Sequence, residues 1–154
     1  MIELGHETGR LPPFRYAAYV RVGFSETDAQ GVVYYGRYMP YFDLARTEYH
    51  RHLRLGAAST AGFGDFAMRA SNVEYHAPAR FDDLLEVFVR AERIGTTSVT
   101  FDHAAYRVGD DGDADELMVT AKQTLVCLDL AARKAIPVPD EYRRLVLAFE
   151  GGET

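Results

Sequence analysis

The sequence predicts an α+β protein in which a curved antiparallel sheet covers a single long helix. Apolar residues recur at helical spacing over residues 36–53, which indicates one amphipathic helix. Four strand-like runs follow with little helix between them, and the Gly- and Asp-rich residues 109–113 between the last two are typical of a hairpin turn. These four runs are residues 66–75, 84–94, 97–108 and 116–128.

The elements before and after these runs complete the layout. Residues 16–24 alternate apolar with other side chains and predict a first, half-buried strand. In the helix, one stripe is formed at spacings of four, three, four and four by Tyr38, Phe42, Ala45, Tyr49 and Leu53. The small, Gly-rich residues 56–64 predict a connecting loop, and residues 141–149 predict a short closing helix.

Length and composition predict one domain. A chain of 154 residues with 47% apolar residues can bury a single core, which we place at residues 14–150 after a flexible tail at 1–13. The net charge of −6 argues against nucleic-acid binding. We expect no membrane insertion and a cytoplasmic protein, because no run approaches about 20 apolar residues and the first residues have no export pattern.

The run from Ser25 to Tyr35 is the most informative part of the chain. Asp28 follows a predicted strand, and Gly31 permits a tight turn just before the long helix begins. The first N–H groups of a helix have no intrahelical acceptor. A carboxylate beside such donors could attack a carbonyl group and stabilise its oxyanion. An Asp before a helix is often only an N-cap, but Asp28 lies too far ahead of this helix to cap it directly.

Four segments resemble the hot-dog-fold acyl-CoA thioesterases, of the 4-hydroxybenzoyl-CoA thioesterase and Tol-Pal-associated types. They are Glu-Thr-Asp-Ala-Gln-Gly-Val-Val-Tyr at 26–34, Ala-Arg-Thr-Glu at 45–48, Val-Glu-Tyr at 73–75 and Ala-Pro-Ala-Arg-Phe-Asp-Asp at 77–83. The likeness spans residues 16–137. It implies a hot-dog fold, in which the curved antiparallel sheet wraps the central helix.

The resemblance also implies an acyl-CoA thioesterase whose catalytic residues are Asp28 and the backbone N–H at Tyr35. Many Tol-Pal-type relatives carry His at the latter position, so only a main-chain role transfers to Tyr35. The residues that it implies for substrate binding are Gly31, Val33, Tyr34, Tyr38, Thr97 and Ser98, with weaker candidates for the nucleotide end of coenzyme A at residues 93–98 and at Lys134.

Two other functions stay open at this stage. A non-catalytic acyl-CoA binding protein is one, because Tyr35 replaces the His of some relatives. A hot-dog hydratase or dehydratase is the other, although no His falls in the Asp28 turn. His76 ends a strand and could reach a pocket, whereas the favoured role of Glu48 is to pair with an arginine. Cys127 lies in an apolar run and is expected to be a core residue.

The resemblance implies no cofactor and no metal, since coenzyme A is part of the substrate. The expected substrate is an acyl-CoA or acyl-carrier-protein thioester, and the expected assembly is a homodimer or a dimer-of-dimers tetramer. The acyl group depends on pocket depth, set by residues such as Phe63, Phe66 and Met68. Asp28 could act as nucleophile or as general base, and the sequence does not separate the two.

Overall fold

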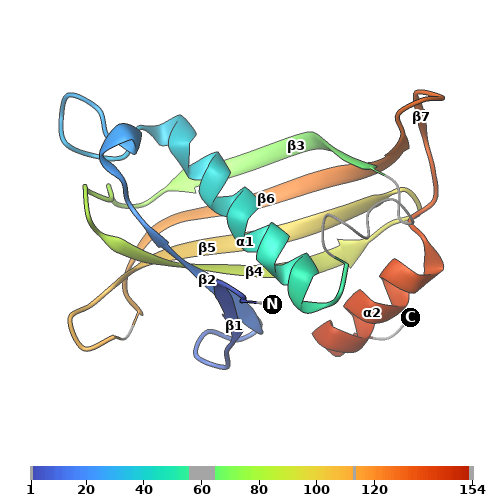
Figure 1. Ribbon diagram of the computed structural model, residues 1–154, viewed down its shortest axis with the longest axis horizontal. Coiled ribbons are helices and arrows are strands. Elements are labelled where there is room, and N and C mark those ends of the chain that lie inside the picture. Colours follow the sequence, from blue (N-terminus) through green and yellow to red (C-terminus); the bar gives the residue numbers. More distant parts are fainter. Residues whose placement is uncertain (1, 56–64, 113, 153–154) are drawn as a thin grey trace.

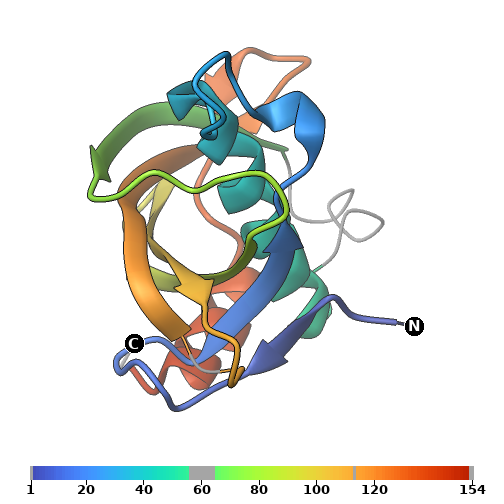
Figure 2. The same ribbon diagram turned by 90° about the vertical axis from the view of Figure 1, so that its left-hand side faces the viewer.

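A curved antiparallel sheet wraps one side of a long helix, α1 (Tyr38–His52), in the computed structural model (Figures 1 and 2). The structure describes residues 2–55, 65–112 and 114–152. Along the sheet the order is β1-β2-β4-β5-β6-β3, with β7 paired to β6. The strands are β1 (Gly5–Glu7), β2 (Tyr16–Arg21), β3 (Asp65–Tyr75), β4 (Leu84–Ile94), β5 (Ser98–Val108), β6 (Ala114–Asp129) and β7 (Lys134–Ala135). The predicted α+β layout is confirmed.

The core lies between α1 and the concave face of the sheet. Four members of the predicted stripe, from Tyr38 to Tyr49, are buried, and Leu53 packs against them from the end of the helix. Every second residue of the facing strands points toward them, including Val87, Val89 and Phe101. The closing helix α2 (Asp140–Glu150) forms within one residue of the predicted bounds at each end. The predicted loop at residues 56–64 lies outside the described residues.

The first predicted strand is three residues too long. β2 ends at Arg21, and a 3-10 turn (Phe24–Glu26) follows. Val22 forms two backbone hydrogen bonds with the residues just before β4. Its N–H donates to Asp83 O at 2.9 Å, and its carbonyl oxygen accepts from the Asp82 N–H at 3.0 Å. The chain then bends because the Gly23 N–H donates to Glu26 Oε1 at 2.9 Å. Alternation of side chains continues through this bend, so the sequence pattern could not mark it.

The expected flexible tail at 1–13 differs from the structure, which places a strand there. β1 pairs with β2, with His6 opposite Ala17. His52 of α1 lies between two carboxylates of this segment, 3.2 Å from Glu3 and 2.9 Å from Glu7. The fully buried Glu86 of β4 pairs with His6 at 2.8 Å, and also with Arg10. These contacts join residues far apart in the chain, and so a local pattern could not predict them.

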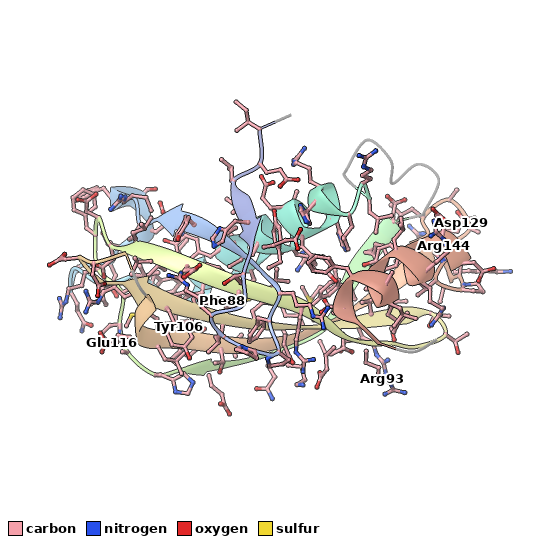
Figure 3. The ribbon with its side chains drawn as sticks, turned by 90° about the horizontal axis from the view of Figure 1, so that it is seen from below. Phe88, Arg93, Tyr106, Glu116, Asp129 and Arg144 are labelled. Atoms are coloured by element: carbon pink, nitrogen blue, oxygen red, sulfur yellow. The ribbon has the colours of Figure 1, made fainter. Side chains whose placement is uncertain are left out.

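The sheet face turned away from α1 has a small apolar cluster of its own. Phe88 and Tyr106 make a T-shaped contact there, with ring centroids 5.8 Å apart (Figure 3). Leu11 and Phe14 pack against the same cluster from the N-terminal segment. The segment that was expected to be loose therefore covers part of this face.

The two edges of the sheet differ in length. β1 forms one edge with three residues, whereas β3 forms the other with eleven, most of them exposed. A register shift between Met68 and Ala70 interrupts the pairing of β3 with β6. Among the described residues, no helix is both long enough and apolar enough to cross a bilayer.

Candidate active site

A tight turn positions Asp28. Thr27 and Val33 pair as an isolated bridge, and the Asp28 N–H donates to Val32 O at 2.9 Å. The Gly31 N–H donates back to Asp28 O at 3.0 Å. Gly31 has a φ of +80°, in the left-handed region that a side chain disfavours. The sequence prediction of a glycine-dependent turn after the acid is confirmed.

The turn also orients the Asp28 carboxylate. Its Oδ1 accepts a hydrogen bond from the Gln30 N–H at 2.8 Å and a longer one from the Val32 N–H at 3.5 Å. Both donors belong to the turn itself, so the side chain is fixed relative to its own loop. Asp28 is exposed and faces the cavity described below. It is therefore both oriented and reachable by a ligand.

The helix entrance lies directly after this turn. The Val33 N–H donates to Ala79 O at 2.8 Å, and the Tyr34 N–H donates to Glu26 O at 2.9 Å. The chain then forms a 3-10 turn (Tyr35–Arg37), closed by the Arg37 N–H on Tyr34 O at 2.8 Å, and continues into α1. The N–H groups of Tyr35 and Gly36 precede that first closing bond. They form the positive end of a helix that runs for fifteen further residues.

A cavity of about 590 Å³ brings the turn, the helix entrance and the end of β3 together. Its walls come from two segments far apart in the chain, residues 28–38 and residues 75–78. The lining residues are Asp28, Gln30, Val32, Val33, Tyr35, Tyr38, Tyr75, His76, Ala77 and Pro78. The acid and the helix entrance that the sequence predicted therefore face one space.

Tyrosine rings form much of one wall of this cavity. The Tyr38 ring is 2% exposed, and its hydroxyl accepts a hydrogen bond from the Ala79 N–H at 3.2 Å. Burial raises the pKa of Tyr38, so its phenol is neutral at physiological pH. Tyr75 lies 5.8 Å from Tyr38 and 6.4 Å from Tyr35, centroid to centroid, and its hydroxyl donates to Tyr35 O at 3.0 Å. These contacts join β3 to the helix entrance.

Glu26 stabilises the loop from behind. Its carboxylate accepts hydrogen bonds from the Ser25 hydroxyl at 2.7 Å, the Gly23 N–H at 2.9 Å and the Tyr41 hydroxyl at 3.2 Å. These bonds, led by the one from Ser25, lower the pKa of Glu26. The residue does not line the cavity, and so its place in the turn motif has a structural explanation.

Not every predicted site residue lies at the cavity. Val33 and Tyr38 line it, whereas Gly31 shapes the turn and Tyr34 stacks on Tyr35 with centroids 4.3 Å apart. Thr97 and Ser98 lie at the opposite end of the sheet within this chain. Asp28 comes after the end of β2, where Arg21 pairs with Leu84, the first residue of β4. Ser98 begins β5 beside the other end of β4.

The weaker candidates divide in the same way. Arg93 and Lys134 lie at the Thr97 end of the sheet, the first of them seen in Figure 3. Cys127 is fully buried in the core as predicted, and burial raises the pKa of its thiol. Glu48 pairs with Arg51 at 3.2 Å, as predicted. Among the described residues no three His, Cys, Asp or Glu side chains form a metal site.

Six of the residues that line the cavity were not assigned to the site from the sequence, namely Gln30, Val32, Tyr75, His76, Ala77 and Pro78. Tyr75 belongs to the Val-Glu-Tyr motif that carries the family resemblance, and the Nε2 of His76 lies 3.1 Å from Thr120 Oγ1. Of the residues expected to set pocket depth, Phe66 packs against Tyr142 near the other end of β3, and Phe63 lies outside the described part of the chain. Tyr75 ends a strand at the Ala-Pro motif, which is the signal that could have placed it.

Comparison with known proteins gives consistent matches. Residues 22–146 match the thioesterase-like superfamily. An acyl-CoA thioester hydrolase, YbgC, of Escherichia coli is 35% identical over 121 residues, which cover 78% of this chain and 87% of that protein. A thioesterase of Thermus thermophilus, solved with coenzyme A and zinc, superposes with a TM-score of 0.78 at 25% identity, covering 94% and 100% of the two chains. A 4-hydroxybenzoyl-CoA thioesterase superposes with a TM-score of 0.76 at 22% identity, covering 84% and 96%.

Proposed function

The chain belongs to the thioesterase-like superfamily, and we propose that it hydrolyses acyl-CoA thioesters with Asp28 as the catalytic carboxylate and the Tyr35 backbone N–H as an oxyanion donor. The hot-dog resemblance read from the sequence is confirmed at the level of the family and the fold. The observation that carries the proposal is that Asp28 and the entrance of α1 line one cavity. That is the pair of groups which thioester hydrolysis requires.

The chemistry follows from this pair. Attack on the thioester carbonyl carbon places a negative charge on its oxygen, and a backbone N–H at the positive end of a helix stabilises that charge. The C–S bond then breaks and coenzyme A leaves as the thiolate. Asp28 either attacks directly, giving a mixed anhydride that water hydrolyses, or removes a proton from the attacking water. In both routes, one water is consumed and an acid and a free thiol are formed.

A single turnover in ¹⁸O-labelled water tests for direct attack, because ¹⁸O in the Asp28 side chain arises only through the anhydride. If Asp28 attacks directly and water then attacks the Asp28 carbonyl carbon of the anhydride, ¹⁸O enters the Asp28 side chain and an Asp28 oxygen leaves in the product acid. Proton removal by Asp28 incorporates ¹⁸O into the product acid alone. Mass spectrometry of the peptide that contains Asp28 reads the difference.

We propose further that two copies pair through β3, as a homodimer that can stack into a tetramer. β3 is a long, mostly exposed edge, and pairing covers such an edge. Two copies of one strand related by a two-fold axis run antiparallel. The start of β5 in the partner, at Thr97 and Ser98, then lies at the same end of the joined sheet as Asp28 of the first copy. This arrangement supports a role for Thr97, Ser98 and Arg93 in binding the coenzyme A portion across the interface.

The test of function is thiol release from a panel of acyl-CoA thioesters and one acyl-carrier-protein thioester. We expect Asp28→Asn, which keeps the size of the side chain and removes its charge, to lower kcat by about several hundredfold. Asp43→Asn is a matched control, because Asp43 is an exposed carboxylate of α1 that pairs with Arg46 at 2.6 Å and does not line the cavity. Tight acyl-CoA binding without thiol release by the native protein would favour the non-catalytic binding protein instead.

A further inference from the structure

We propose that Tyr75 is a positioning residue, whose hydroxyl fixes the Tyr35–Gly36 peptide at the helix entrance so that the Gly36 N–H stays directed at the substrate carbonyl, as a second donor beside the Tyr35 N–H. The inference rests on the proposed function, since it concerns the donors that would stabilise the oxyanion. It means that β3 orients a backbone N–H of the site, which neither the Asp28 turn nor α1 does.

The contact itself is direct. Tyr75 is the last residue of β3, and its hydroxyl donates to the Tyr35 carbonyl oxygen at 3.0 Å. The Tyr75 ring has a fixed backing, because it packs at 5.8 Å against Tyr38, which is 2% exposed and bonded to the Ala79 N–H. Tyr75 therefore reaches the helix entrance from a well-defined position.

A peptide group is planar, and its C=O and N–H point in opposite directions. Fixing the Tyr35 oxygen therefore also fixes the direction of the Gly36 N–H. The neighbouring hydrogen bonds fix other peptide groups. The Tyr34 N–H donates to Glu26 O, and the Arg37 N–H donates to Tyr34 O, so that neither bond involves the Tyr35–Gly36 peptide. The Tyr75 bond acts on the peptide between these two.

Gly36 makes this anchor important. Without a Cβ, glycine gives the adjoining peptide more conformational freedom than any other residue. If the Tyr35–Gly36 peptide rotated, a carbonyl oxygen would take the place of an N–H, and its negative end would repel the oxyanion. The bond from Tyr75 opposes that rotation because it would be lost.

The hydroxyl, as distinct from the ring, carries the proposed role. A phenylalanine would keep the packing against Tyr35 and Tyr38 and lose only the bond to the carbonyl. Tyr75 is 50% exposed, so water can replace that bond, and its loss should change overall stability little. An effect on catalysis with little effect on folding is thus the signature of a positioning role.

The experiment is steady-state kinetics of Tyr75→Phe beside the native protein and Asp28→Asn. We expect kcat of Tyr75→Phe to fall by about tenfold or more while KM stays within about twofold, because the donors act on the transition state more than on the bound substrate. Tyr106→Phe is the matched control, since it removes a tyrosine hydroxyl on the opposite face of the sheet (Figure 3). Its kinetics should equal those of the native protein.

A structural measurement accompanies the kinetics. The ¹³C′ shift of Tyr35 and the ¹⁵N shift of Gly36 report the hydrogen bond at this peptide. Both should change in Tyr75→Phe and stay constant in Tyr106→Phe.

The outcomes separate the two proposals. An unchanged kcat in Tyr75→Phe, with Asp28→Asn inactive, overturns the positioning role and leaves the thioesterase proposal standing. A rise of KM in step with the fall of kcat also overturns it, because that pattern belongs to lost binding surface. A native protein that releases no thiol, or an Asp28→Asn variant as active as the native one, overturns the proposed function itself.

Discussion

The Tyr41 hydroxyl of α1 donates a hydrogen bond to Glu26 Oε1 at 3.2 Å, and thereby joins the helix to the loop that carries Asp28. Tyr41 is 5% exposed, so its ring position is set by the core. Glu26 also accepts bonds from Ser25 and Gly23 on its own loop. The loop is therefore joined to the buried core.

Glu26→Gln is expected to destabilise the protein at neutral pH and to have no effect in strong acid. The ordinary pKa of the group, 4.5, is lowered in the folded state, chiefly by the bond from Ser25. A lowered pKa means that the ionised form stabilises the fold above pH 4.5, and that this contribution is lost as the pH falls below 4.5. Urea unfolding of both proteins at several pH values measures it. A difference between them that is constant across this range would contradict the prediction.

Gly31→Ala should lower both stability and activity. The φ of +80° costs a side chain about 1–2 kcal/mol, although a Cβ there meets no atom within 4 Å. The turn that relaxes this strain is the one that orients Asp28. Gly112→Ala is the matched control, because Gly112 has a φ of +85° in equally open space in a different turn.

The two glycine variants should thus lose similar stability in urea unfolding, while thiol release falls only in Gly31→Ala. Equal activities would show that the Asp28 turn tolerates the change, and would weaken the argument that its conformation matters.

His103 should make the protein less stable in mild acid. It is 2% exposed and stacks on Phe42 with centroids 4.8 Å apart. Burial, and then the nearby Arg46, lower its pKa from 6.5 to about 3. Between these values the unfolded chain binds a proton that the folded chain excludes, so stability falls as the pH drops below 6.5, by up to about 1.4 kcal/mol per pH unit.

His103→Leu removes this titrating group and should reduce the dependence of stability on pH between 6.5 and 4.5, leaving the part that comes from His50, whose pKa burial also lowers to about 3. Phe101→Leu is the control, because it reduces the buried core nearby without removing a titratable group. Its slope should match that of the native protein. A His103→Leu slope as steep as the native one would mean that other groups cause the acid sensitivity.

Glu150 connects α2 to the rest of the core. Its Oε2 accepts bonds from the Tyr49 hydroxyl at 2.6 Å and from the Ala91 N–H at 2.9 Å, and burial raises its pKa. Glu150→Ala leaves both donors without this acceptor and should cost about 1–3 kcal/mol in urea unfolding. Glu141→Ala, on the same helix, breaks an exposed pair with Arg144 (Figure 3) and should leave stability unchanged. A loss of equal size in both variants would contradict a special role for Glu150.

The parts of this molecule that local pattern determines were predictable. The stripe from Tyr38 to Tyr49 predicted α1, because every fourth or third residue must face the sheet. The strand-like run at residues 84–94 predicted β4 with its observed bounds. The turn at Gly31 followed from the need for a left-handed residue between Asp28 and the helix.

Contacts between distant segments could not be predicted in the same way. The pairing of Glu3 and Glu7 with His52, and of His6 with Glu86, gives the N-terminal segment its place in the sheet. Likewise, the bond from Tyr75 to the Tyr35 carbonyl depends on how β3 lies against the helix entrance. No spacing along the chain encodes either relationship.

The order of the strands in space differs from their order along the chain, and this affects when the protein can become active. β3 is synthesised before β4, β5 and β6, but its neighbour in the sheet is β6, the last long strand to leave the ribosome. The N–H groups of His76 and Ala77 are bonded to Met118 O of β6, at 2.8 and 3.1 Å, so the second wall of the cavity takes its position from β6. A growing chain therefore contains the Asp28 segment before it contains the strand that positions the second wall, and the complete site can form only after β6 has been synthesised.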